Sequence, residues 1–156
     1  MKENFDRTLA FVLKVEGATF TNYSDGPTKY GLTLDTMIKL GLDLDKDGEV
    51  TTADVMLVTP EVVEAAFRKI AWDAIGADNL PGGIDLVAAD LAYNSGAGKY
   101  EQMEREGYTT TYDQLCMRRL NFYRYQRDHY PSQVKFWNGW VNRILDVWIE
   151  AMKCTV

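Results

Sequence analysis

The spacing of apolar residues predicts a chain built mainly from helices. A first apolar stripe runs at helical spacing from Phe5 to Leu13 and continues to Glu16. Gly17 then ends this predicted helix. Residues 19–33 are rich in Thr, Tyr, Asp, Gly and Pro and predict a loop or short hairpin region. Further helices are expected at about 34–40, 60–75, 84–92, 112–129 and 134–152.

Length and composition indicate one globular domain over residues 1–156. The 156 residues are 46% hydrophobic and 26% charged, as in ordinary folded proteins. The net charge of −6 argues against nucleic acid, whose phosphates require a basic surface. Cys116 and Cys154 lie far apart and predict free thiols, not a disulfide framework.

The N-terminal segment and the hydropathy of the chain indicate where in the cell the protein resides. Charged Asp6 and Arg7 interrupt the first apolar run, so residues 1–17 do not read as a signal peptide. No apolar stretch approaches the length of a membrane span. We therefore expect a monomer without membrane insertion that stays in the cytoplasm of the cell that makes it.

An alternation of acidic residues over 43–54 forms the sharpest local motif. Carboxylates occupy its first, third and fifth positions, Gly48 the sixth and Val50 the eighth. This pattern resembles the EF-hand calcium loop, in which oxygen ligands at that spacing converge on one cation. The expected Ca²⁺ ligands are Asp43, Asp45, Asp47, the Glu49 carbonyl and Asp54. The shorter Asp54 replaces the usual glutamate and could weaken binding or admit Mg²⁺; a solvated acidic loop is the alternative.

Glu16 is the candidate catalytic acid. A carboxylate at the end of an apolar helical stripe is expected to be partly desolvated and protonated near neutrality. A general acid for cleavage of a glycosidic bond needs that state. A helix-end glutamate that simply reaches into water is the alternative.

Several segments in matching order resemble a known family. The Glu16-Gly17 pair and the Thr-x-x-Gly-aliphatic-Thr element at 28–33 resemble the start of the family 108 glycoside hydrolases. These are phage-type N-acetylmuramidases of the lysozyme superfamily. The segments that carry the resemblance are 15–17, 22–26, 28–33, 80–86, 90–96 and 139–143.

The resemblance implies a mainly α, lysozyme-like fold and an endolysin that acts on bacterial peptidoglycan. Such an enzyme cleaves the β-1,4 bond between N-acetylmuramic acid and N-acetylglucosamine, with Glu16 as its acid. Asp25 stands nine residues later, as in related phage lysozymes, and Thr28 or Thr33 could be the third member of the site. In addition, Tyr93-Asn94-Ser95-Gly96 is similar to the Tyr-Asn-x-Gly turn of lytic transglycosylases and goose-type lysozymes. The expected substrate contacts are Tyr30, Tyr93 and Asn94.

The sequence departs from the family at 100–112, a compressed form of a peptidoglycan-binding-like stretch that lacks the Asp-Gly turn. Two alternatives stay open. One is a lytic transglycosylase on the same substrate, and the other is a non-catalytic, calcium-dependent wall-binding or virion protein. Asp90 is expected to be a hydrogen-bonded structural carboxylate. Trp137, Trp140 and Trp148 are expected to pack in the core.

Overall fold

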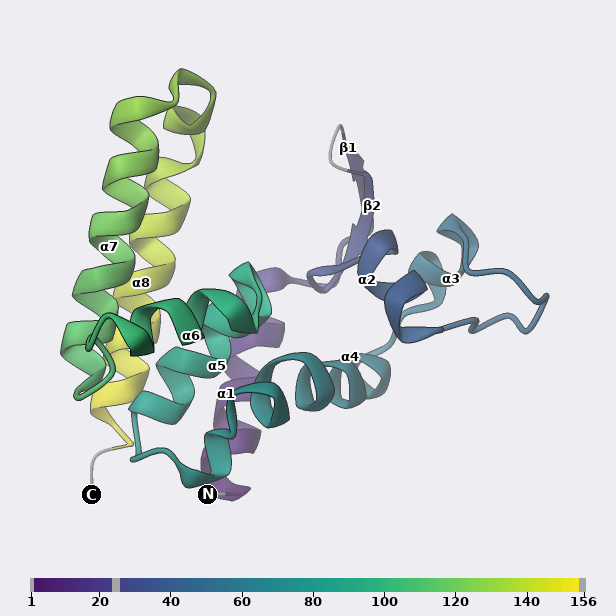
Figure 1. The fold of residues 1–156 in the computed structure, drawn as a ribbon. Helices are drawn as coiled ribbons and strands as arrows, with labels where there is room; N and C mark the ends of the chain where they lie inside the picture. The colour runs from purple at the N-terminus through teal and green to yellow at the C-terminus, as the bar shows by residue number, and fades with distance from the viewer. Residues whose placement is uncertain (1, 24–25, 155–156) are drawn as a thin grey trace. The chain divides into compact units, whose positions relative to one another are not determined.

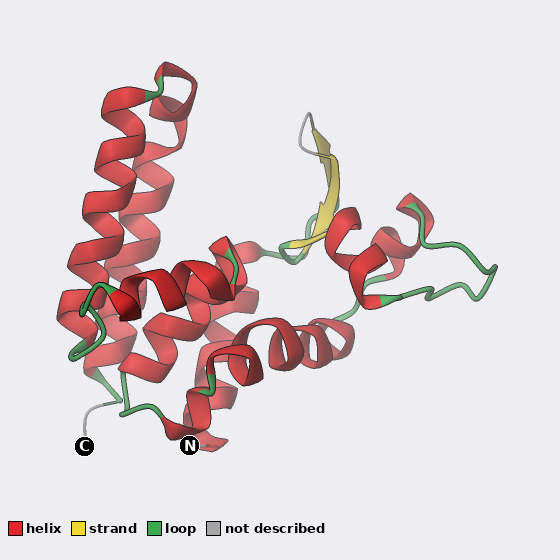
Figure 2. Ribbon diagram, viewed as in Figure 1, coloured by secondary structure: helices red, strands yellow, loops and turns green. Residues whose placement is uncertain are grey.

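The computed structural model describes residues 2–23 and 26–154 and is mainly α-helical, as predicted (Figure 1, Figure 2). The α-helices are α1 (Lys2–Glu16), α2 (Leu34–Leu40), α3 (Thr52–Leu57), α4 (Pro60–Phe67), α5 (Ile84–Ser95), α6 (Ala97–Arg105), α7 (Tyr112–His129) and α8 (Trp137–Met152). The strands are β1 (Thr21–Tyr23), β2 (Gly26–Lys29) and β3 (Leu32–Thr33).

The chain divides into two compact units, one of residues 9–69 and one of residues 1–8 with 70–156. Helix α1 contributes to both. The prediction of one catalytic domain stays a prediction.

The unit of residues 9–69 is built around a small sheet. Its strands are antiparallel in the order β1-β2-β3, and helices α2 and α3 pack against β2. Thr33 begins α2, because its hydroxyl accepts the N–H of Thr36, and Gly41 ends it with a φ of +67°. The core of this unit consists of fully buried apolar side chains, among them Val12, Leu32, Met37, Val55, Val63 and Phe67.

Helix α5 is the centre of the other unit. Its residues from Ile84 to Ala92 are all buried, and α6, α7 and α8 pack around it. Helices α7 and α8 run side by side as a hairpin, joined by the 3-10 segment Pro131–Phe136 (Figure 1). The ring of Phe5 meets Trp72 edge-on at 5.3 Å. Both rings are buried, which fixes the start of α1 to this unit.

The predicted helices are confirmed, with three differences. The segment predicted as one helix to residue 75 is α-helical only to Phe67, then continues as a π-helical turn, Arg68–Trp72, and a 3-10 turn, Asp73–Ile75. The last helix begins at Trp137, because Pro131 starts a separate 3-10 segment. Helix α5 runs to Ser95, past its expected end near 92. Only Gly96, with a φ of +84°, separates it from α6, a helix that the sequence pattern did not predict.

The expectation that the tryptophans of the last helix fill the core is wrong. Trp137, Trp140 and Trp148 are all partly exposed, whereas Trp72 is fully buried. The buried face of α8 consists of Ile144, Val147 and Ala151. The mixed spacing of the three tryptophans places them beside this face and not on it. Within the described residues, no helix is long and apolar enough to cross a bilayer.

Candidate active site

Glu16 is the last residue of α1, and its side chain is half-buried. The helix ends there because Gly17 takes a φ of +71°, which favours glycine. The N–H of Gly17 still donates to the Leu13 carbonyl at 3.1 Å. The predicted helix end is therefore confirmed, and the half-buried Glu16 stands at it.

A tight turn of the sheet lies against the Glu16 side chain. Lys29 pairs with Leu32, so Tyr30 and Gly31 form a two-residue hairpin turn. Both have positive φ, +52° and +77°, as a type I′ turn requires. A Cβ on Gly31 would lie 2.8 Å from the carboxyl carbon of Glu16 and 2.9 Å from its Oε2. Any larger residue at this position would therefore displace the Glu16 carboxyl group.

The two candidate threonines lie directly opposite each other, Thr28 on β2 and Thr33 on β3. Opposed residues of an antiparallel pair present their side chains on the same face. The Thr33 hydroxyl caps α2, because it accepts the Thr36 N–H at 3.2 Å and shares a hydrogen bond of 3.0 Å with the Thr36 hydroxyl. Thr28 is thus the better candidate for holding a water molecule. Asp25, the predicted second carboxylate, lies outside the described residues.

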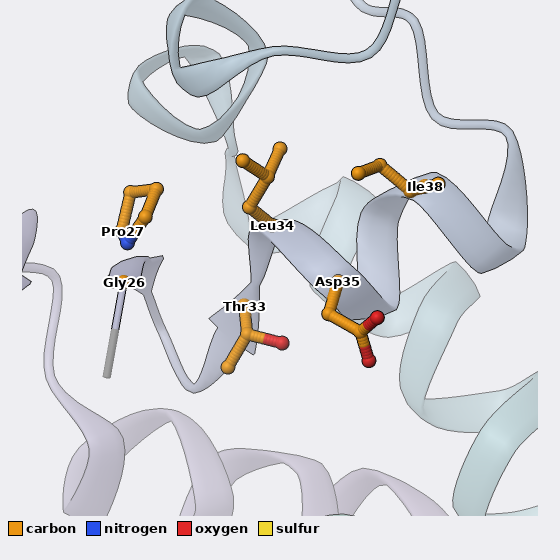
Figure 3. Close-up of a pocket in the computed structure, with 6 residues that line it drawn as sticks. All are labelled: Gly26, Pro27, Thr33, Leu34, Asp35 and Ile38. Atoms are coloured by element: carbon orange, nitrogen blue, oxygen red, sulfur yellow. The ribbon is translucent and has the colours of Figure 1, made fainter. Parts of the chain in front are cut away.

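A cavity of about 330 Å³ opens beside the same hairpin (Figure 3). In Figure 3 the side chains of Leu34 and Ile38 point to one side of the ribbon and those of Thr33 and Asp35 to the other. Apolar carbons combined with a few placed oxygens are typical of ligand pockets. Thr33 and Asp35 supply the polar side chains of this lining.

The predicted substrate residues fall in both units. Tyr30 belongs to residues 9–69 and is half-buried in the hairpin turn. Tyr93, also half-buried, and the exposed Asn94 lie in the last turn of α5, in the other unit. Their contacts with substrate stay predictions.

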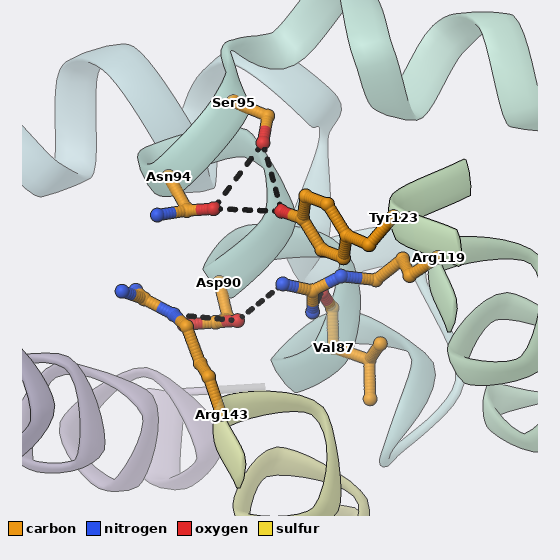
Figure 4. Close-up of polar contacts among 7 residues, drawn as sticks. All are labelled: Val87, Asp90, Asn94, Ser95, Arg119, Tyr123 and Arg143. Carbon is orange, nitrogen blue, oxygen red and sulfur yellow. Dashed lines mark hydrogen bonds and ion pairs between the residues drawn. The ribbon is translucent and has the colours of Figure 1, made fainter. Parts of the chain in front are cut away.

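Asp90, one turn before Asn94, is fully buried in a network of charges (Figure 4). It accepts a hydrogen bond from Arg119 on α7 at 2.9 Å and one from Arg143 on α8 at 2.8 Å. Burial raises the pKa of Asp90, but the charges of Arg143 and Arg119 outweigh burial and hold the pKa below its ordinary value. As predicted, Asp90 is a structural carboxylate.

A second polar layer lies one helical turn away from this ion network (Figure 4). The hydroxyl of Tyr123 donates to the side-chain oxygen of Asn94 at 2.9 Å, and the Ser95 hydroxyl donates to the same oxygen at 3.3 Å. The Tyr123 ring stacks on Trp140 with centroids 4.6 Å apart. Sequence reasoning missed Arg119 and Tyr123, although their spacing of four places both on one face of α7.

The acidic loop lies between α2 and α3. Asp43, Asp45 and Asp47 can offer carboxylate oxygens that all lie within 4.8 Å of one another. The Gly48 N–H donates to Asp43 Oδ2 at 2.9 Å, while Asp43 Oδ1 is buried and has no hydrogen-bond partner within the described residues. A buried carboxylate oxygen without a donor fits a site for a hard cation such as Ca²⁺.

Asp54, the predicted twelfth ligand, lies outside this group of three. Its carboxylate is fully buried and accepts the N–H of Thr51 at 2.7 Å, of Leu44 at 2.6 Å and of Asp45 at 3.2 Å. The bond from Thr51, followed by that from Leu44, holds the pKa of Asp54 below its ordinary value. Asp54 thus joins the two ends of the loop, and the role of the Glu49 carbonyl stays a prediction.

The fold and this arrangement define a class: a lysozyme-like, mainly α protein with a carboxylate at a helix end beside a small sheet. Residues 9–96, more than half of the chain, match the model of glycosyl hydrolase family 108. The chain belongs to this family. Membership makes it a glycoside hydrolase and supports peptidoglycan as its substrate.

The fold is also that of a solved structure. The chain is similar to SagA of Brucella abortus, with a TM-score of 0.82 and 21% sequence identity over 99% of this chain and 97% of that one. At this identity the likeness shows the fold alone. No curated protein matches the chain.

Proposed function

We propose that this chain is an N-acetylmuramidase that hydrolyses the β-1,4 bond between N-acetylmuramic acid and N-acetylglucosamine, with Glu16 as the general acid. The observation that carries the proposal is the contact between the Glu16 carboxyl group and Gly31. The hairpin turn excludes water from one side of the carboxyl group and restricts its rotation. A glycosidase acid must be placed in this way to protonate the leaving oxygen.

The second half of the reaction requires a water molecule to attack the oxocarbenium-like sugar. Thr28 offers a hydroxyl that the helix cap does not occupy, whereas Thr33 already caps α2. In this proposal Thr28 orients the water and Asp25 stabilises the positive charge. Tyr30, Tyr93 and Asn94 contact the glycan.

A comparison of Glu16→Gln with the wild type tests the proposal through the clearing of purified peptidoglycan. Glutamine keeps the shape of the side chain and removes the transferable proton, so clearing should fall by at least about a hundredfold. Glu64→Gln is the control, because Glu64 is an exposed glutamate of the same unit. Equal clearing by Glu16→Gln would refute Glu16 as the acid. Absence of clearing by the wild type would instead favour a non-catalytic wall-binding or virion protein.

The mass of the products separates hydrolysis from transglycosylation. Hydrolysis adds one water to each cleaved bond, whereas a transglycosylase leaves an anhydro sugar and adds none. We expect the hydrated product. In the biological setting proposed here, the enzyme acts as a monomer on the wall during phage lysis.

We also propose that residues 43–54 bind Ca²⁺ in a structural role. The convergence of Asp43, Asp45 and Asp47 and the unpaired oxygen of Asp43 support this site. The proposed acid, Glu16, lies outside this loop, so the ion would have no part in the chemistry and would stabilise the segment between α2 and α3.

A further inference from the structure

The side-chain amide of Asn94 is held through its oxygen atom. Its Oδ1 accepts hydrogen bonds from the hydroxyls of Tyr123 and Ser95, at 2.9 and 3.3 Å. Figure 4 shows the amide nitrogen on the side turned away from Tyr123. Within residues 2–23 and 26–154 this nitrogen has no acceptor, and Asn94 is exposed. Two amide N–H donors are therefore presented to solvent in a fixed direction.

Tyr123 is itself held rigidly. Its side chain is 5% exposed and its ring stacks on Trp140 at an interplanar angle of 17°. One turn earlier on α7, Arg119 forms the buried ion pair with Asp90, which lies one turn before Asn94 on α5. The ion pair between Arg119 and Asp90 and the hydrogen bond between Tyr123 and Asn94 both join α7 to α5, at successive helical turns. The ion pair therefore fixes the register at which the Tyr123 hydroxyl meets Asn94.

Packing alone does not explain the hydroxyl group of Tyr123. If packing alone were required, phenylalanine would stack on Trp140 equally well and would bury no polar group. The hydroxyl instead restrains one exposed amide at the end of α5. Restraint of an exposed side chain adds little to stability, but it lowers the entropy that the side chain loses when it binds a ligand.

We propose that Tyr123 is a positioning residue for glycan binding. It holds the Asn94 side chain so that Nδ2 donates to an acceptor oxygen of the peptidoglycan glycan. The inference rests on the proposed function, because it takes Asn94 as a substrate contact, and it adds the residue through which that contact is oriented.

The test measures the affinity of soluble glycan chains from purified peptidoglycan for Glu16→Gln protein by calorimetry. Tyr123→Phe keeps the ring and removes only the hydroxyl, and it should weaken binding about two- to tenfold. In a Glu16→Gln protein that also carries Asn94→Ala, Tyr123→Phe should have no further effect, since it acts through Asn94. In the Glu16 wild-type background, Tyr123→Phe should raise KM and leave kcat within about twofold.

Asn94→Asp provides a second variant that does not depend on the buried tyrosine. Aspartate keeps an oxygen for the Tyr123 hydroxyl but replaces the amide donor, so it should weaken binding at least about tenfold. Tyr125→Phe is the control, because Tyr125 lies on the same helix, is 51% exposed and stacks on His129.

Either of two results would overturn the proposal: unchanged affinity in Asn94→Asp, or an effect of Tyr123→Phe that is equally large with and without Asn94. Persistent hydrolysis by Glu16→Gln would instead refute the acid while leaving this coupling measurable. The two failures are therefore distinguishable.

Discussion

The carboxyl group of Glu16 lies against the Cα of Gly31, so closely that a Cβ there would stand 2.8 Å from the carboxyl carbon. The two residues are fifteen positions apart, and each is placed by a local device. Gly17 ends α1 after Glu16, and the paired Lys29 and Leu32 close the hairpin around Gly31. Glycine is favoured at position 31 for two independent reasons: the positive φ of the turn and the Glu16 carboxyl group that lies against it.

Gly31→Ala should reduce both stability and activity. Alanine at a φ of +77° costs about 1–2 kcal/mol, and its methyl group would displace the Glu16 carboxyl group. We expect peptidoglycan clearing per folded molecule to fall at least about tenfold, because small displacements of a catalytic group are costly.

Gly41→Ala is the matched control for this substitution. Gly41 has a similar φ of +67°, and nothing lies within 4 Å of the position of its Cβ. It should lose comparable stability in urea denaturation and keep its clearing activity. Equal activity loss in the two variants would show that the contact with Glu16 has no role.

The two threonines should separate into a catalytic and a structural residue. Thr28→Val removes a hydroxyl that caps no helix and should lower kcat with little change in the free energy of unfolding. Thr33→Val removes the cap of α2 and should cost about 1 kcal/mol of stability. Urea denaturation and steady-state kinetics measure both effects. If only Thr33→Val lowered kcat, Thr33 would be the catalytic residue and Thr28 would not.

Patterns within one element were readable from the sequence, and contacts between elements were not. The helix end at Glu16, the helix Tyr112–His129 and the Thr59-Pro60 start all follow from periodicity and capping chemistry. The pairing of Asp90 with Arg119 depends on how two helices pack, and a periodic pattern contains no information on the partner.

Asp54 illustrates a second limit of the sequence. Its position matches both patterns, since a calcium loop takes a carboxylate at its twelfth position and a capping box takes one three residues after its Thr. The structure shows both reciprocal bonds of the capping box between Thr51 and Asp54. Likewise, Tyr30 and Gly31 could be placed in a hairpin region, but not against Glu16.

Calcium should raise the melting temperature of the wild type, and a chelator should lower it. At a free Ca²⁺ concentration of a hundred times Kd, the stabilisation is about 2.7 kcal/mol. Asp43→Asn should abolish this increment. Asp54→Ala should lower stability with and without Ca²⁺, because three N–H groups lose their acceptor.

Asp35→Asn serves as the control for the calcium experiment, since Asp35 is exposed on α2 and pairs with Lys39. It should keep the full increment. A melting temperature that neither Ca²⁺ nor chelator changes would refute the calcium site.

The buried Asp90 should make stability depend on pH in the acid range. Arg143 and Arg119 hold its folded pKa below the ordinary value of 3.8, so the stabilisation is fully present above about pH 5 and is lost as the pH falls through the folded pKa. Asp90→Asn leaves the buried Arg119 without its counter-charge and should cost about 3–5 kcal/mol at pH 7. Urea denaturation from pH 2 to pH 7 measures both effects. The exposed Asp146→Asn should follow the wild-type curve, and an Asp90→Asn protein as stable as the wild type at pH 7 would refute the structural role of the ion network.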